Sequence, residues 1–95
     1  MKRKNQPLQQ LPNIGEKLAT ELAGIGIRTP QQLSKVGSVD CYVRLSLAHG
    51  ARHLPHCYYL FSLQAALEGR HWRHLAPEEK QRLIDEARRR LRRVA

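Results

Sequence analysis

The sequence predicts an all-α fold, a compact domain of four or five helices. Apolar residues recur every three or four positions along most of the chain, which is the period of a helix with one buried face. Glycines interrupt this pattern where helices should end, namely at Gly24, Gly26, Gly37, Gly50 and Gly69. Residues 43–47 also alternate like a strand, but a lone strand would have no partner. A helix is therefore the better interpretation there.

Ninety-five residues indicate one domain, because a second core would leave each half too small to fold unaided. We expect residues 1–7 to form a flexible basic arm and residues 8–95 to form a single helical domain. Residues 8–11 could form a short helix at the start of that domain. The arm has no apolar stretch behind it, so we do not expect it to be a signal peptide. No apolar run approaches the roughly 18–20 residues of a membrane span, and a cytoplasmic location is expected.

The first long helix is predicted over residues 15–23, directly after the turn sequence Leu11-Pro12-Asn13-Ile14-Gly15. Ile14, Leu18 and Leu22 then repeat every fourth residue. A glycine-containing turn followed by a helix has the layout of a helix-hairpin-helix element. In such an element, consecutive backbone amides at the helix N-terminus can bind a phosphate whatever the base sequence.

Two shorter helices are predicted over residues 30–36 and 38–49. Thr29 and Gln32 have the spacing of a capping box, in which each side chain bonds the backbone amide of the other residue. Ser38 is expected to cap the second of these helices with its hydroxyl. Together these signals fix where both helices begin.

Residues 56–68 are apolar on nearly all sides and should form the central buried helix. The last helix is predicted over residues 77–92, with acids in its first turn and arginines at its end, where each charge suits the helix dipole. Trp72, between these helices, is expected to fill the core rather than to bind a ligand. The predicted core contains Leu18, Leu22, Leu33, Leu60, Leu67, Trp72 and Leu83.

The chain has 17 Lys and Arg against 8 Asp and Glu, a formal net charge of +9, which favours a polyanionic partner, chiefly nucleic acid. The hairpin offers one candidate contact, because its amides and a nearby lysine could bind a phosphate. The hypothetical DNA phosphate-binding residues are Asn13, Ile14, Gly15 and Lys17. Asn13 stands where many such hairpins have glycine, and Glu16 places a negative charge beside the site. The alternative that this is only a packed helix start stays open.

A second basic patch lies at the end of the chain. Its members are Arg88, Arg89, Arg90, Arg92 and Arg93, which place five positive charges within six positions. These arginines could contact phosphates, or they could form a solvated helix end whose charge suits the dipole. The sequence leaves both alternatives open.

Neither catalysis nor metal binding has support in the sequence. His53, His56 and Cys57 match none of the common zinc spacings, so neither a metal nor another cofactor is expected. There is no nucleophile motif, glycine-rich phosphate loop or paired-acid arrangement, and we expect no enzyme activity and no small-molecule substrate. Cys41 and Cys57 lie on apolar faces and are expected to be reduced, each acting as a small buried hydrophobic residue.

Four segments occur in order along the chain: Leu11–Ala19, Gly26–Leu33, Val36–Val39 and Leu67–Trp72. Through them, residues 8–87 closely resemble the C-terminal domain of the TfoX (Sxy) family. The resemblance implies an all-α, helix-hairpin-helix-like fold in a bacterial protein, with no catalytic residues. Members of the family are linked to natural competence and act with a cyclic-AMP receptor protein at certain promoters. They usually carry an additional N-terminal domain, for which we expect no room in this chain.

We therefore expect a small regulatory module that binds DNA weakly through phosphates in a transcription or competence system. The alternative is a protein–protein adaptor that docks a transcription regulator without direct DNA contact. Salt separates the two, because phosphate binding weakens steeply with salt and apolar docking does not. No membrane partner is expected, because the apolar stripe of the last helix is narrow and is needed for the core.

Overall fold

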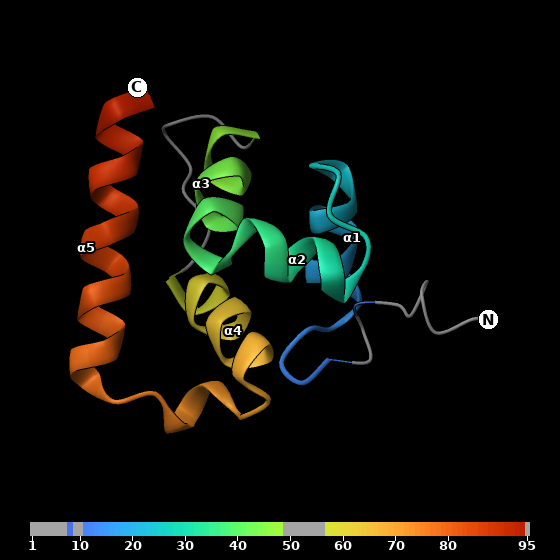
Figure 1. Ribbon diagram of the computed structural model, residues 1–95, viewed down its shortest axis with the longest axis horizontal. Coiled ribbons are helices and arrows are strands. Elements are labelled where there is room, and N and C mark those ends of the chain that lie inside the picture. Colours follow the sequence, from blue (N-terminus) through green and yellow to red (C-terminus); the bar gives the residue numbers. More distant parts are fainter. Residues whose placement is uncertain (1–7, 9–10, 49–56, 95) are drawn as a thin grey trace.

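The computed structural model describes residues 8, 11–48 and 57–94, and the described chain is helical (Figure 1). The helices are α1 (Glu16–Gly24), α2 (Pro30–Val36), α3 (Ser38–Ala48), α4 (Cys57–Glu68) and α5 (Pro77–Val94), with a 3-10 turn η3 (Trp72–His74) before α5. None of the described residues lies in a strand. The all-α prediction is confirmed, and the predicted helix bounds agree with these to within two residues.

Several sequence predictions fall on residues that the structure does not describe. These are the arm over residues 1–7, the helix end at Gly50 and the connection that follows it. A helix-hairpin-helix element would also need its first helix over residues 8–11, where only Leu8, in a 3-10 turn, and Leu11 are described. The helix-hairpin-helix detail therefore stays a prediction.

The ends of the helices follow the local signals in the sequence. At the start of α2, the amide of Gln32 donates to Thr29 Oγ1 at 3.1 Å, and the amide of Thr29 donates to Gln32 Oε1 at 3.2 Å. This is the predicted capping box, and it is confirmed. Helices α1 and α4 are terminated at Gly26 and Gly69, whose φ angles of 88° and 72° are left-handed. At each, the next amide bonds the carbonyl five residues back, which is the Schellman arrangement.

Ser38 does not cap α3, so that prediction is wrong. Ser38 is itself the first residue of the helix and is buried, and its hydroxyl donates to Gln64 Oε1 on α4 at 2.6 Å. The residue before the helix is Gly37, whose carbonyl accepts the amide of Cys41 at 3.1 Å. The Ser38 side chain faces α4, and its hydrogen bond to Gln64 therefore links α3 to α4.

The core lies between α1, α2, α3 and α4, with α5 against one side. Its largest fully buried hydrophobic side chains are Leu22, Leu33, Leu45, Leu60, Leu63 and Cys41. Helix α5 adds Ala87 as its one buried residue in the described chain. The predicted burial of Leu18, Leu22, Leu33 and Leu60 is confirmed.

The predicted burial of Leu67, Trp72 and Leu83 is wrong, because all three are half-buried. Leu67 and Leu83 pack against the edge of the core, since α5 covers only one of its sides. The Trp72 ring lies outside the main core and does not fill it. The Lys80 ammonium lies 5.4 Å from its centroid, and the imidazole of His71 stacks on it at 5.8 Å.

The arrangement separates the two ends of the described chain. Helices α3 and α4 lie in the middle of the molecule, α1 lies at one end of its long direction and α5 at the other (Figure 1). The molecule measures 41 × 28 × 21 Å. Within the described ranges, no helix combines the length and the apolar character needed to cross a membrane.

Candidate nucleic-acid interface

The turn before α1 is held by the side chain of Asn13. This residue has a φ angle of 71°, a left-handed conformation that asparagine tolerates better than most residues. Its Nδ2 donates to the Arg70 carbonyl at 2.7 Å, and its Oδ1 accepts the Trp72 amide at 3.1 Å. The side chain therefore joins the turn to the connection after α4, and it is engaged with the protein's own backbone rather than directed to a ligand.

Ile14 and Gly15 play different roles at this helix start. Ile14 is buried in the core, and its amide points to the Leu11 carbonyl at 3.4 Å. Gly15 is exposed and occupies the N-cap position, where no side chain caps the helix. Its φ angle is −91°, and a Cβ atom there would have no neighbour within 4 Å. The fold thus has room for a side chain at this position, and the approach to the first amides of α1 is open.

The charges at this helix start nearly cancel. Lys17 is exposed and could add a cation to the open amides, but Glu16 is exposed beside it in the first turn. A carboxylate there suits the positive end of the helix and repels a phosphate. The hairpin therefore offers amides and one lysine, opposed by one acid.

The end of α5 has a clear surplus of positive charge. Arg88, Arg92 and Arg93 are exposed, and none has an ion-pair partner among the residues that the structure describes. Arg88 and Arg92 are one turn apart, about 6 Å along the helix axis. Beyond Glu86 the sequence contains no further acid. Cations in the last turns also suit the negative end of the helix dipole, so the fold tolerates them.

Two other arginines of the patch are already paired. Arg89 and Arg90 both bond Glu86, one turn earlier in α5, and Arg90 also pairs with Asp40 on α3. The hydrogen bonds from Arg89 and Arg90 lower the pKa of Glu86, so this carboxylate stays ionised to a lower pH than an ordinary glutamate. The structure thus divides the predicted basic patch into three unpaired arginines and two arginines held by acids.

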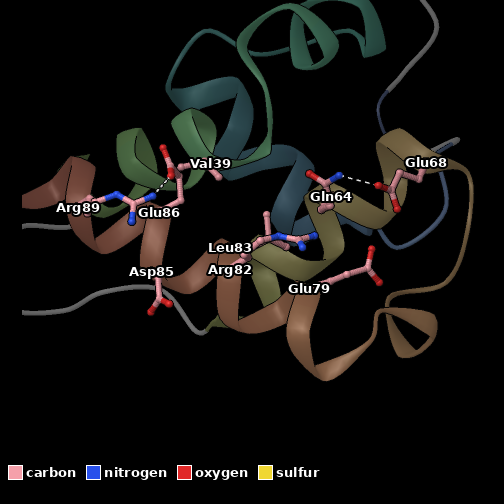
Figure 2. Close-up of a pocket in the computed structure, with 9 residues that line it drawn as sticks. All are labelled: Val39, Gln64, Glu68, Glu79, Arg82, Leu83, Asp85, Glu86 and Arg89. Carbon is pink, nitrogen blue, oxygen red and sulfur yellow. Dashed lines mark hydrogen bonds and ion pairs between the residues drawn. The ribbon is translucent and has the colours of Figure 1, made fainter.

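A groove of about 370 Å³ lies between α3, α4 and α5 (Figure 2). It is lined by Val39, Gln64, Glu68, Glu79, Arg82, Leu83, Asp85, Glu86 and Arg89. Its four carboxylates outnumber its two guanidinium groups, which disfavours a phosphate ligand. Arg70, just outside, bonds Glu68 at 2.7 Å and Glu79 at 2.8 Å. These ion pairs brace α4 against the start of α5.

The thiols and histidines show no metal-binding arrangement in the described chain. Cys41 is buried and free, and burial raises the pKa of its thiol to about 11, which keeps it protonated and unreactive at neutral pH. His53 and His56 lie outside the described residues, and so does the side chain of Cys57. Elsewhere, residues 11–48 and 57–94 bring no three His, Cys, Asp or Glu side chains together as a metal site.

The sequence analysis missed the acids that hold the basic patch. Glu86 and Arg90 are four residues apart, the spacing at which helical side chains meet, and this signal was available. Asp40 and Arg90 are 50 residues apart, and only the packing of α3 on α5 brings them together. The same packing places the hairpin and the basic patch at opposite ends of the molecule (Figure 1). They cannot share one phosphate.

Comparisons with known proteins find one matching family and solved structures of similar fold. The model of the TfoX C-terminal domain matches residues 4–87. The crystal structure of an uncharacterized protein from Listeria monocytogenes, in a triclinic form, is 32% identical with a TM-score of 0.74, covering 83% of this chain and 86% of that chain. A tetragonal structure of a protein of unknown function from the same organism is 31% identical with a TM-score of 0.75, covering 85% and 95%. No curated protein matches. The chain belongs to the TfoX C-terminal domain family.

Proposed function

We propose that this domain binds duplex DNA weakly and without base preference, through phosphates, with the end of α5 as its main contact. The observation that carries the proposal is a set of three exposed arginines, Arg88, Arg92 and Arg93, which lie in a stretch with no acid and have no ion-pair partner among the described residues. Guanidinium groups donate to phosphate oxygens in a forked geometry, and such contacts carry no sequence information. The hairpin at α1 is a second, weaker contact in this proposal, through Gly15 and Lys17.

The surroundings of the aromatic residues favour a duplex over a single strand. Single strands are usually held by bases stacked on exposed aromatic rings. Here Lys80 lies over both the Phe61 and the Trp72 rings, at 5.5 and 5.4 Å, and His71 stacks on Trp72. Tyr42 and Tyr59 are buried. Among the described residues, Tyr58 is therefore the exposed aromatic ring on which an unpaired base could stack.

Membership of the TfoX C-terminal domain family supports a place in a transcription or competence regulatory system. The two Listeria monocytogenes structures are of uncharacterized proteins and add no function. In this proposal the domain supplies non-specific DNA affinity, and the choice of promoter comes from another protein. A transcription regulator is the expected protein partner.

The test is a titration of labelled duplex DNA, followed by anisotropy, between about 50 and about 200 mM salt. We expect micromolar or weaker binding and a log–log salt slope of about −3 to −4, for some four neutralised phosphates. Replacing Arg88, Arg92 and Arg93 together by Gln should make the slope shallower by about three units.

A matched control removes three charges elsewhere. Arg28, Lys35 and Arg73 are exposed and lie away from the last turns of α5, on or near α2 and on η3, which precedes the start of α5. Their joint replacement by Gln should leave the salt slope close to that of the wild type. Equal slopes for the two triple variants would show that only net charge matters. No duplex binding even at low salt would overturn the proposal and favour the adaptor alternative.

A further inference from the structure

Arg90 is the arginine of the basic patch that the fold holds most firmly. Its Nε donates to Glu86 Oε2 at 3.1 Å, and its Nη1 donates to Asp40 Oδ1 on α3. Two carboxylates therefore occupy its guanidinium from two sides. The side chains of Arg90 and Asp40 are 40% and 44% exposed, so a solvent-borne anion can reach the pair.

The space around this pair opens toward an unpaired cation. Asp40, Val43, Glu86, Arg90 and Arg93 line a groove of about 310 Å³ between α3 and α5. Arg93 has no ion-pair partner among the described residues and is exposed at the edge of this groove. Two arginines thus face two carboxylates, and removing one carboxylate would leave a local surplus of positive charge next to Arg93.

We propose that Asp40 is an autoinhibitory residue, which keeps Arg90 from DNA phosphates and so limits the affinity of the α5 end. The inference rests on the proposed phosphate binding at that end. Exposed ion pairs are weak and are screened by salt, so a phosphate of the duplex can compete with Asp40 for the guanidinium. Glu86 alone cannot occupy all the donors of Arg90, because a guanidinium has five N–H groups in a fork. Without Asp40, Arg90 and Arg93 form one continuous phosphate-binding edge.

The first arm of the test compares two charge-matched variants. Asp40→Asn should tighten duplex binding roughly fivefold at about 0.1 M salt and make the salt slope steeper by about one unit, for one added phosphate contact. Glu78→Gln is the control, because it removes the same charge from an exposed site at the other end of α5, about 18 Å along the helix from Arg90. The control should leave the slope unchanged. Equal effects of the two variants would overturn the proposal.

The second arm is a double-mutant cycle. In the background of Arg90→Gln, Asp40→Asn should no longer tighten binding beyond the control, because the released arginine is absent. A gain that persists without Arg90 would overturn the proposal, since it would show a general charge effect. Asp40→Ala should repeat the result of Asp40→Asn, and unchanged urea midpoints would confirm that the variants fold.

The outcomes separate this inference from the proposed function. If the wild type binds duplex with the expected salt slope and the cycle shows no coupling between Asp40 and Arg90, only the autoinhibitory contact is overturned. If the wild type does not bind duplex at low salt, both fail.

Discussion

The two ends of the molecule use polar residues in opposite ways. At the α1 end, the polar group of Asn13 is engaged with the protein itself, bonding the backbone of the connection after α4. At the α5 end, Arg88, Arg92 and Arg93 remain exposed and unpaired among the described residues. The hairpin carries the recognisable motif, yet Asn13 and Ile14 are engaged in the fold itself. The arginines have no evident part in folding, which leaves them available to a partner.

The two ends of the molecule also differ in how many of their side chains are buried. Helix α1 buries Ile14, Leu18 and Leu22 in or just before it, whereas the described residues of α5 include only Ala87 as a buried side chain. The α1 end is thus part of the core, and the last turns of α5 lie against its edge. We therefore expect substitutions at the α1 end to change stability and substitutions at the α5 end to change binding.

The largest difference between the two ends should appear in the free energy of unfolding of variants with truncated apolar side chains. Leu22→Ala removes a side chain with no solvent exposure and should reduce the free energy of unfolding by about 2–5 kcal/mol. Leu91→Ala, at a half-buried position in α5, should reduce it by about 1 kcal/mol. Urea unfolding measures both. A greater loss at Leu91 than at Leu22 would show that α5 is integral to the core.

The next effect tests the Asn13 side chain. Asn13→Ala should reduce the free energy of unfolding by about 2–3 kcal/mol, because it leaves two backbone groups without their partner and puts a Cβ-bearing residue without a polar side chain at a left-handed φ. Asn13→Gly relieves the backbone conformation but not the hydrogen bonds and should lose about 1–2 kcal/mol. Arg88→Ala, the matched change at the α5 end, should be nearly neutral. A neutral Asn13→Ala would contradict the structural role of the turn.

A smaller effect concerns DNA binding at the hairpin. Lys17→Gln should make the salt slope shallower by about one unit, and this change should add to that of the α5 triple variant because the two sites lie at opposite ends of the molecule (Figure 1). Gly15→Ala places a methyl group in front of the α1 amides without a clash in the fold, so any loss of affinity reports close approach of a phosphate. If neither variant alters binding while the α5 triple variant abolishes it, the hairpin is structural only.

The smallest expected effect is in acid stability. Glu79 accepts the Ala76 amide at 2.8 Å and pairs with Arg70, and these contacts lower the pKa of its carboxyl. A lowered folded-state pKa means stability that is present above the ordinary value near 4.5 and is lost as the pH falls through the folded-state pKa. Glu79→Gln should therefore reduce the fall in Tm between about pH 5 and about pH 3. Glu78→Gln, which removes a carboxylate with no partner in the described chain, should not.

Helix positions could be predicted from the sequence because their signals are local. The capping box at Thr29 and Gln32 and the glycine at position 26 each act within about five residues, and the structure follows them. The hydroxyl of Ser38 shows where local reasoning fails. A serine before a helix normally caps it, but here Gln64 on another helix takes its hydrogen bond. Only the packing of α3 on α4 decides between these partners.

The candidate site could be predicted in part for the same reason. Charge composition indicated the arginines after position 87, and the turn sequence indicated the open glycine at position 15. Neither indicated that Asn13 would bond residues 57 and 59 positions away, or that Asp40 would hold Arg90. Burial at helix edges was also overestimated, since Leu67 on α4 and Leu83 on α5 are only partly buried and pack against the core from outside.

The Asn13 hydrogen bonds make two distant loops into one cooperative opening unit. Breaking the turn before α1 releases the amide of Trp72, and releasing the connection after α4 removes both partners of Asn13. We therefore expect local unfolding of the two loops to be coupled, as within a single foldon. Hydrogen exchange at the Trp72 amide should accordingly follow the opening of residues 11–15, although that amide lies in a different part of the chain. The exchange rate of an amide in one loop then reports how often the other loop opens.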